Sequence, residues 1–542
     1  MGNATLAYIL WELLVSLYLL WIPAFGRWNP TDSMSFPVVL GGIAILVALW
    51  LKGNSRNRPP LPPGPPADPI LGHLRHIVSE HEEKQFYDWG KIYGDVIHLS
   101  LLGQSVIVLN SVQAATDLLD KRSAIYSDRP QLMSLKLLGF ADHALPLMPY
   151  GKTFQRHRRM LHQHLLADRA ISYRPTQLRE AYAVLKSLLE NGVEWEKVIQ
   201  RYSTAIIMDV AFGHQVTSDD DIYVKLAEEA EKVVNNAGSG GSPMDVFPFL
   251  RYFPSWFPGA YYAGYARDNR KVIEEVHNYP FEQMQRAIAS GTAKPCFLSY
   301  HLEGLNREGE KYPYSAEDIK GASGMLYLAA ADTTYSSLST FFLAMVLYPD
   351  CQLKAQKEID DVIGSERLPD FSDRGSLPYL DCLVQETLRW NNAAPMGVPH
   401  RSTEDDIYKG MFIPKGSIVI PNTRGMTLDE RIYVDPTTFN PSRYLPKPDG
   451  NGEPFPVGPF GFGRRICPGR HFADASLWIA AASILATMNI SKAIGEDGKD
   501  MTPKGEYSAG IVSHPLPYQC RIQPRNEAAR DLIARVDISE SF

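Results

Sequence analysis

A long apolar segment from Ser315 to Tyr348 places the strongest constraint on how this chain can fold. The segment opens with Ser315-x-x-Asp318, which resembles a helix capping box with Asp in place of the usual Glu or Gln. At about 1.5 Å per residue, a helix of this length would run roughly 50 Å. The sequence therefore predicts a helix that is long enough to cross the whole molecule.

Asp332-Thr333-Thr334 stands in the centre of this apolar run. A lone carboxylate in such surroundings is costly unless it is hydrogen-bonded or has a function. One interpretation is structural: a threonine hydroxyl bonds back to the carbonyl four residues before it, and the acid forms a salt bridge. The other interpretation is a functional site inside the molecule, and these residues alone leave both open.

A second informative segment, Phe460 to Gly469, presents one cysteine in a glycine-containing loop. An apolar stretch from His471 to Met488 follows it and is predicted to be a helix. Glycines allow a tight turn, and a helix N-terminus favours a deprotonated sulfur, so Cys467 is a candidate thiolate ligand for a metal. Iron in a haem fits, because a cysteine axial ligand favours cleavage of the O–O bond.

Other uses of this cysteine loop compete with haem. A lone cysteine is most often a small buried hydrophobic residue. Zinc would require further Cys or His ligands at short spacing, and only His471 is close. The Cys-x-x-Cys-His motif of covalently bound haem is absent, and the third glycine of a dinucleotide-binding fingerprint would fall on Ile466.

The cysteine loop resembles the haem-binding signature of the cytochrome P450 monooxygenases. The matching residues are Phe460, Gly463, Arg465, Cys467 and Gly469. The resemblance implies the cytochrome P450 fold, a mainly helical (α+β) body with a small β-rich region. It also implies that haem b, iron protoporphyrin IX, is bound by Cys467 as the proximal ligand. In the family, Phe460 would contribute to the haem site and Arg465 would bind a haem propionate.

The resemblance extends to the central helix and to a charged pair after it. Thr333 and Asp332 match the family's alcohol and acid that deliver protons during oxygen activation. Ala330 stands where the family usually has glycine, and it is still small enough to admit oxygen near the helix. Glu386 and Arg389 have opposite charges at i and i+3, a spacing that alone is common on helix surfaces.

Three more positions follow the family pattern. Arg443, upstream of the cysteine loop, would complete a buried network with the charged pair and so support the loop. Arg158 and His400 match propionate-binding positions, although His400 could equally be a surface histidine. Phe154 replaces the usual tryptophan; it keeps the packing but lacks the indole N–H.

Composition and cysteine content limit the partners and the compartment expected for this chain. The chain has 542 residues, is 45% hydrophobic and has a net charge of −7, so it can bury a sizeable core but has no basic excess suited to nucleic acid. Five widely spaced cysteines argue against a secreted disulfide framework, and the catalytic part is expected to face the cytosol.

No flavin or nicotinamide fingerprint is present, so electrons must come from a separate protein. A local basic face suited to an acidic donor is expected from Arg156, Arg159, Arg464 and Arg470.

Two apolar segments, 6–25 and 36–51, precede a basic cluster that should stay cytosolic. The second is slightly shorter than the roughly 20 residues that span a bilayer core, so one span and a hairpin of two are both open. A cleaved signal peptide is the alternative for the first segment, which lacks a basic leading region and contains Glu12. We expect a membrane anchor at 1–51.

The rest of the chain is expected to form a hinge, one body and a tail. A basic and proline-rich hinge covers 52–66; its prolines form an extended spacer, or a ligand for proline-reading modules. The catalytic domain covers 67–525 and the polar C-terminal tail 526–542. Within the domain, 96–101 and 106–109 alternate like a hairpin, while most later segments are helical. Aromatic residues at 247–257 form either a buried cluster or a patch at the membrane interface.

Together with the resemblance, these features predict a haem-thiolate monooxygenase in the endoplasmic reticulum membrane, with its catalytic domain on the cytosolic face. It would use O2 and NADPH to hydroxylate or epoxidise a hydrophobic terpenoid, sterol or other fungal secondary metabolite. The resemblance implies a diflavin NADPH-cytochrome reductase as partner, with cytochrome b5 as a second candidate. Residues 511–517 are similar to fungal microsomal members, in particular basidiomycete ones that resemble sterigmatocystin-pathway oxygenases. The alternatives are a haem-thiolate isomerase or dehydratase that works without O2, and a non-catalytic haem sensor or membrane adaptor.

Overall fold

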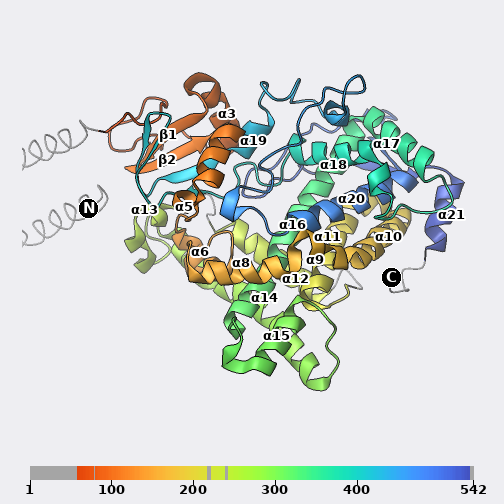
Figure 1. The fold of residues 1–542 in the computed structure, drawn as a ribbon, viewed down its shortest axis with the longest axis horizontal. Helices are drawn as coiled ribbons and strands as arrows, with labels where there is room; N and C mark the ends of the chain where they lie inside the picture. The colour runs from red at the N-terminus through yellow and green to blue at the C-terminus, as the bar shows by residue number, and fades with distance from the viewer. Residues whose placement is uncertain (1–57, 79, 217–220, 238–241, 537–542) are drawn as a thin grey trace, which may run out of the picture.

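The computed structural model describes residues 58–78, 80–216, 221–237 and 242–536. Helix α16 (Ala316–Leu347) runs through the middle of the molecule (Figure 1) and confirms the predicted central helix. Its capping box forms with aspartate: the Asp318 N–H donates to the Ser315 hydroxyl at 3.1 Å, and the Ser315 N–H donates to the Asp318 carboxylate at 3.1 Å.

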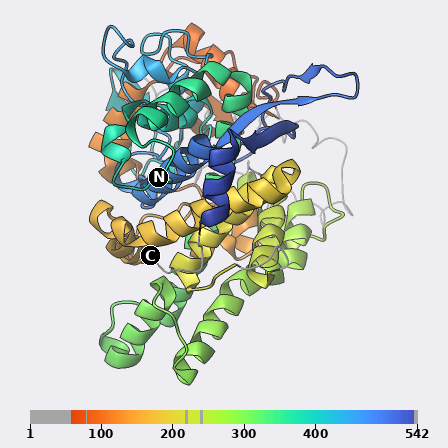
Figure 2. The same cartoon turned by 90° about the vertical axis from the view of Figure 1, so that its right-hand side faces the viewer.

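The helices that pack against α16 come from both sides of it in the sequence. They are α7 (Phe140–His143), α8 (Lys152–Leu165), α11 (Trp195–Phe212), α14 (Tyr261–Ser290), α15 (Phe297–Glu308), α17 (Pro349–Val362), α18 (Pro378–Trp390) and α20 (Arg470–Thr487). Their buried side chains form one large apolar core, in which the Trp195 and Phe342 rings stack 5.0 Å apart. Helix α20 confirms the helix predicted after the cysteine loop. Figure 2 shows α14 and α15, in green, extending together away from the body.

The remaining helices surround this core. They are α3 (Glu82–Tyr93), α4 (Val112–Ala115), α5 (Ser123–Tyr126), α6 (Met133–Leu137), α9 (Ala167–Ala170), α10 (Arg174–Asn191), α12 (Ile222–Asn235), α13 (Pro243–Val246), α19 (Thr423–Thr427) and α21 (Glu527–Arg535). Residues of α21 were expected in a polar tail. Instead, Asn526 caps the helix, Ile533 is fully buried, and α21 packs against α10 and α20.

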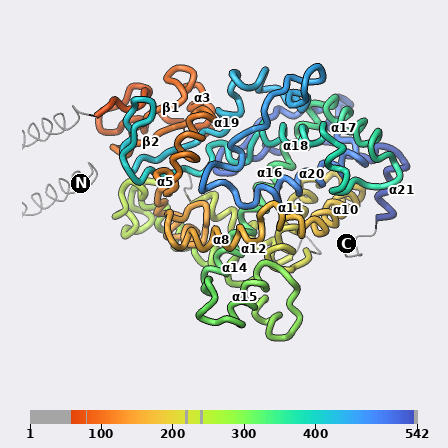
Figure 3. The backbone as a smooth tube through the Cα atoms, in the orientation of Figure 1, coloured from red at the N-terminus to blue at the C-terminus, as the bar shows by residue number. Residues whose placement is uncertain are grey.

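The main sheet joins distant parts of the chain. Its strand order is β1 (Val96–Leu101), β2 (Gln104–Leu109), β6 (Ile418–Pro421) and β3 (His400–Arg401), so Figure 3 shows orange and blue-green segments side by side. The predicted hairpin is confirmed, and it turns at Leu102 and Gly103, whose φ angles are 49° and 85°. The smaller sheets contain β4 (Asp406–Tyr408) with β5 (Met411–Ile413), and β8 (Asp500–Met501), β7 (Met488–Ile494) and β9 (Cys520–Pro524).

The proline-rich segment lies against these sheets. The carbonyl of Pro63 accepts from the His98 N–H at 3.0 Å, and that of Pro60 accepts from the Phe412 N–H at 2.7 Å. The second half of the predicted hinge is therefore part of the folded body. The predicted anchor at 1–51 lies outside the described residues, and among the residues that are described no helix is both long and apolar enough to span a bilayer.

Candidate active site

The cysteine loop has backbone geometry that glycine adopts most readily. Gly461 and Gly463 have φ angles of 76° and 51°, in the left-handed region. A Cβ on Gly463 would lie 2.2 Å from the carbonyl oxygen of Leu119, so a side chain does not fit there. The loop closes with a hydrogen bond of 2.7 Å from the Cys467 N–H to the Phe460 carbonyl, which places the cysteine directly before α20.

The surroundings of Cys467 act on the pKa of its thiol in both directions. Burial raises the pKa of the Cys467 thiol, and a backbone hydrogen bond at Gly469 and the charges of Arg158 and Arg470 only partly oppose that rise. A coordinated metal ion deprotonates a thiol outright, so the thiolate state at this position depends on bound metal.

Arg465 lies in the interior next to the cysteine. Its guanidinium group donates to the backbone carbonyls of Ser127, Leu145 and Met148, at 2.8, 3.2 and 2.7 Å. It also lies 3.7 Å from the centre of the Phe154 ring, which is a cation–π contact. Phe154 thus takes over the packing role expected for the tryptophan that it replaces.

Four basic side chains lie in this region: Arg129, Arg158, His400 and Arg465. Burial lowers the pKa of Arg158 and of Arg465 to about 10, and burial lowers the pKa values of Arg129 and His400 well below their usual range. Arg129 donates to the carbonyls of Val398 and Pro399, and His400 lies 2.7 Å from the Tyr126 carbonyl.

Among the described residues, the three arginines of this group form no ion pair, and for Arg129 and Arg465 the charge of Asp128 only partly opposes the effect of burial on the pKa. In the part of the chain that the structure describes, no carboxylate lies within ion-pair distance of Arg129, Arg158 or Arg465, and Arg129 Nε has no hydrogen-bond partner. Buried charges are costly unless they are paired. An anionic group bound here would supply the missing charge, and the two propionates of haem b fit this requirement.

The central helix has exposed side chains at the predicted site. Residues 321–327 and 336–346 are buried, whereas Ala329 is exposed and residues 330–333 are partly exposed. An exposed alanine in the middle of a helix that crosses the core means that space adjoins the helix there. Small side chains at 329–331 let a flat apolar group approach closely.

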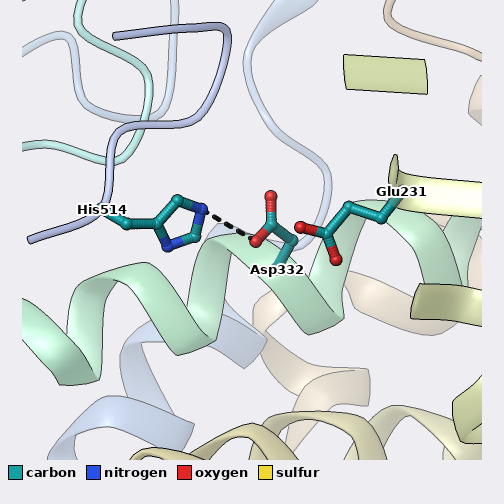
Figure 4. Close-up of side chains that lie close together, drawn as sticks. All are labelled: Glu231, Asp332 and His514. Atoms are coloured by element: carbon teal, nitrogen blue, oxygen red, sulfur yellow. Dashed lines mark ion pairs between the residues drawn. The ribbon is translucent and has the colours of Figure 1, made fainter. Parts of the chain in front are cut away.

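Asp332 and Thr333 adopt the structural arrangement that the sequence left open. The Thr333 hydroxyl donates to the Ala329 carbonyl at 2.9 Å, and the Asp332 carboxylate lies 3.0 Å from Nε2 of His514. Glu231 completes a group of three side chains (Figure 4), whose ligand atoms all lie within 4.8 Å of one another. Because the Thr333 hydroxyl is bonded to a carbonyl of its own helix, it can rotate away from Ala329 and donate a hydrogen bond to another group.

The predicted charged network is assembled and fully buried. Glu386 binds Arg389 through both carboxylate oxygens, at 2.8 and 2.9 Å, and accepts from Arg443 Nε at 3.0 Å. Two partners were not foreseen: Tyr444 donates to Glu386 at 2.7 Å, and Arg443 pairs with Glu453 at 2.7 Å. The network ties α18 to the segment that leads to the cysteine loop.

The predicted basic face is only partly free. Arg156 forms an ion pair with Asp318 at 3.1 Å, so its charge is largely compensated. Arg159 and Arg464 are exposed, and Arg464 donates to the hydroxyl of Tyr150 at 3.0 Å. Arg470 is partly exposed and donates to the Cys467 carbonyl at 3.2 Å, so the positive charge of this face lies mainly at Arg159, Arg464 and Arg470.

Comparison with known proteins gives consistent matches. A family model described as Cytochrome P450 matches residues 62–522. The chain is 39% identical over 522 residues to "Cytochrome P450 monooxygenase 136" of Postia placenta, which covers 94% of this chain and 98% of that protein. It is also 39% identical over 529 residues to "Cytochrome P450 monooxygenase claR" of Ampulloclitocybe clavipes, covering 95% and 96%, and 38% identical over 506 residues to "Cytochrome P450 monooxygenase ple1" of Rhodocybe pseudopiperita, covering 92% and 96%.

Proposed function

The chain belongs to the cytochrome P450 family, a haem-thiolate monooxygenase family, and we propose that it is a membrane-bound, NADPH-dependent member acting on a lipophilic small molecule. The net reaction is RH + O2 + NADPH + H⁺ giving ROH + H2O + NADP⁺, or the corresponding epoxide from an alkene. The proposed substrate class is a terpenoid, a sterol or another fungal secondary metabolite.

The unpaired arginines beside Cys467 carry this proposal. Haem supplies the activation of dioxygen when it is bound through the cysteine thiolate. Cys467 would hold the iron, Phe460 would pack at the ring, and Arg158, His400 and Arg465 would bind the propionates. Arg129 joins this set, because its Nε is buried without a hydrogen-bond partner in the described part of the chain.

Proton delivery separates a monooxygenase from its competitor, a haem-thiolate isomerase or dehydratase. A monooxygenase must bring protons to bound oxygen, whereas an isomerase has no such need. Asp332 and Thr333 stand at the open part of α16, and the acid is in an ion pair that holds it in place. We assign proton delivery to these two residues.

The substrate class follows from the open stretch of α16. Its exposed and partly exposed residues 328–331 are Leu-Ala-Ala-Ala, which present only apolar surface. Apolar walls with few polar groups are typical of sites for lipophilic ligands. The polar group around Asp332 is the exception in this region.

Membrane attachment and an electron donor complete the proposal. Phe247, Phe249, Tyr252 and Trp256 are exposed, by 43, 48, 75 and 80%, which favours a surface patch over a buried cluster. We propose that this patch lies at the cytosolic face of the endoplasmic reticulum membrane. The donor would be a diflavin NADPH-cytochrome reductase, with cytochrome b5 as a second candidate, docking near Arg464 and Arg159.

Reconstitution tests the proposal. Full-length protein in vesicles with a diflavin reductase should show the red-shifted Soret band of the ferrous carbonyl adduct, and Cys467→Ser should lose it. A panel of terpenoids and steroids is then titrated for spectral shifts. A compound that binds should be oxygenated with matched consumption of NADPH and O2. Product formed without O2 or NADPH would instead identify an isomerase or dehydratase.

A further inference from the structure

Three titratable side chains from three separate elements converge beside the open part of the central helix. Glu231 is on α12, Asp332 is on α16, and His514 is in the loop between β8 and β9. Figure 4 shows Glu231 and His514 pointing toward Asp332 from opposite sides. The mutual distances of at most 4.8 Å mean that a proton can pass among them with small side-chain movements.

The loop that carries His514 is fixed to the central helix. The Ser336 hydroxyl of α16 donates to the Ser513 carbonyl at 2.6 Å. Within the loop, His514 N–H donates to the Ser508 hydroxyl at 3.0 Å, and Ser508 N–H donates to the His514 carbonyl at 2.7 Å. Tyr335 packs against the imidazole, with ring centres 5.5 Å apart. These contacts set the ring so that Nε2 meets Asp332.

The second ring nitrogen of His514 is also informative. Nδ1 is buried and has no hydrogen-bond partner among the residues that the structure describes, whereas Nε2 is 3.0 Å from Asp332. A purely structural histidine usually has both ring nitrogens satisfied when they are buried.

The electrostatics show which members hold protons near neutral pH. Burial, the charge of Asp332 and the hydrogen bond with Asp332 raise the pKa of Glu231 to about 7, and Glu228 adds to this rise while His514 opposes it. Burial opposes a charged His514, but the hydrogen bond and charge of Asp332, with the charge of Glu231, raise the pKa of that imidazole. Below about pH 7, Glu231 is therefore a neutral acid with a proton to give.

We propose that Glu231 and His514 are positioning residues in the proton path to Asp332: His514 holds the Asp332 carboxylate toward Thr333, and Glu231 resupplies its proton from solvent. The inference rests on the proposed function. In each turnover NADPH contributes two electrons through the reductase, and two protons must reach oxygen to release water. For each proton delivered, Glu231 transfers its carboxyl proton to the Asp332 carboxylate, Asp332 passes a proton to Thr333 as the Thr333 hydroxyl gives up its own, and Glu231 regains a proton from water.

The variants that test this are Glu231→Gln and His514→Gln, with Glu229→Gln as the matched control. Glu229 is on the same helix and loses the same charge, but its side chain is exposed and outside the group. Glu231→Asp keeps a carboxyl group and should restore part of the function.

The first readout is independent of turnover. Infrared difference spectra of the resting enzyme should contain a protonated-carboxyl band that titrates near pH 7, and this band should be lost in Glu231→Gln and kept in Glu229→Gln.

The second readout is the NADPH:O2 ratio in reductase-driven turnover without added substrate. Reduction of O2 to peroxide uses one NADPH, and reduction to two waters uses two. Glu231→Gln and His514→Gln should raise the peroxide share roughly three- to tenfold, a small part of what a positioned proton donor contributes. Glu229→Gln should match the wild type. In the wild type the peroxide share should rise as the pH passes about 7, where Glu231 loses its proton, and Glu231→Gln should be flat over that range.

Either of two results would overturn the relay: a carboxyl band that survives in Glu231→Gln, or a peroxide share and pH profile in Glu231→Gln that equal those of the wild type. Failure of the proposed function looks different. In that case the wild-type protein itself would lack the red-shifted carbonyl spectrum or would not consume O2 with NADPH.

Discussion

Glu386→Gln is the sharpest test of how the haem-binding loop is supported. The substitution keeps the volume of a fully buried side chain and removes its charge. Oε1 of Glu386 accepts from Arg389 Nη2, Arg443 Nε and the Asn440 N–H; Oε2 accepts from Arg389 Nε and the Tyr444 hydroxyl. Every partner is a donor, so an amide NH2 at either position faces at least one N–H or O–H.

The least harmful orientation places the amide nitrogen at the Oε2 position. Tyr444 can rotate its hydroxyl to accept, but the Nε–H of Arg389 then has no acceptor. The two arginines also differ, because Arg443 keeps Glu453 as a counter-charge, whereas Arg389 keeps only neutral acceptors, namely the amide oxygen at the Oε1 position and backbone carbonyls. Leaving a buried charge without its partner costs roughly 3–5 kcal/mol. We therefore expect a loss of that order in the free energy of unfolding, most of it through Arg389.

The measurement compares unfolding midpoints in urea and the fraction of purified protein that contains haem. Glu274→Gln is the control, because Glu274 forms an exposed i,i+4 pair with Arg270 at 2.8 Å, and such pairs contribute only about 0.3–0.5 kcal/mol. Glu453→Gln should lie between the two, since Arg443 would still be bound to Glu386. A Glu386→Gln protein with full haem content and the stability of the control would show that the network is not what supports the loop.

Three further predictions concern turnover, electron transfer and membrane binding. Thr333→Ala should raise peroxide release per NADPH by on the order of tenfold, because the donor hydroxyl is removed, while Thr333→Ser should stay near the wild type. Arg464→Glu should slow reduction by the diflavin reductase severalfold at low salt and little at high salt, and Arg156→Glu should have the smaller effect because its charge is already paired. In protein that lacks the expected anchor at 1–51, replacing Phe249 and Trp256 with serine should weaken binding to phospholipid vesicles in a flotation assay, and unchanged binding would exclude the patch from the membrane contact.

The sequence predicted those features whose cause is local. The capping residues and the apolar run define α16, and the glycines with Cys467 define the loop, because each depends on neighbours in the chain. Glu386 and Arg389 are one helical turn apart, so their pairing was also visible. Glu231 and His514 could not be linked to Asp332 in this way, because α12 and the loop before β9 meet α16 only in the folded chain. Helix α21 was missed for a related reason: its one deeply buried side chain, Ile533, gives little apolar pattern in a polar segment.

The basic side chains around Cys467 link the cofactor to the stability of the fold. Without a bound anion, buried Arg129 and Arg465 and half-buried Arg158 form no ion pair with an acid among the described residues, and burial lowers the pKa of each. Burial likewise raises the pKa of the Cys467 thiol. A coordinated metal ion would hold this sulfur as a thiolate. In the proposed holoenzyme, haem would supply an iron that holds the sulfur as a thiolate and two propionates that would compensate the arginines, and a ligand that binds only the native state stabilises that state. Arg129→Met should therefore weaken haem binding in a titration, because it removes a charge that would attract a propionate. It should also raise the urea midpoint of the haem-free protein above that of the haem-free wild type, because without the anion this charge has no counter-ion.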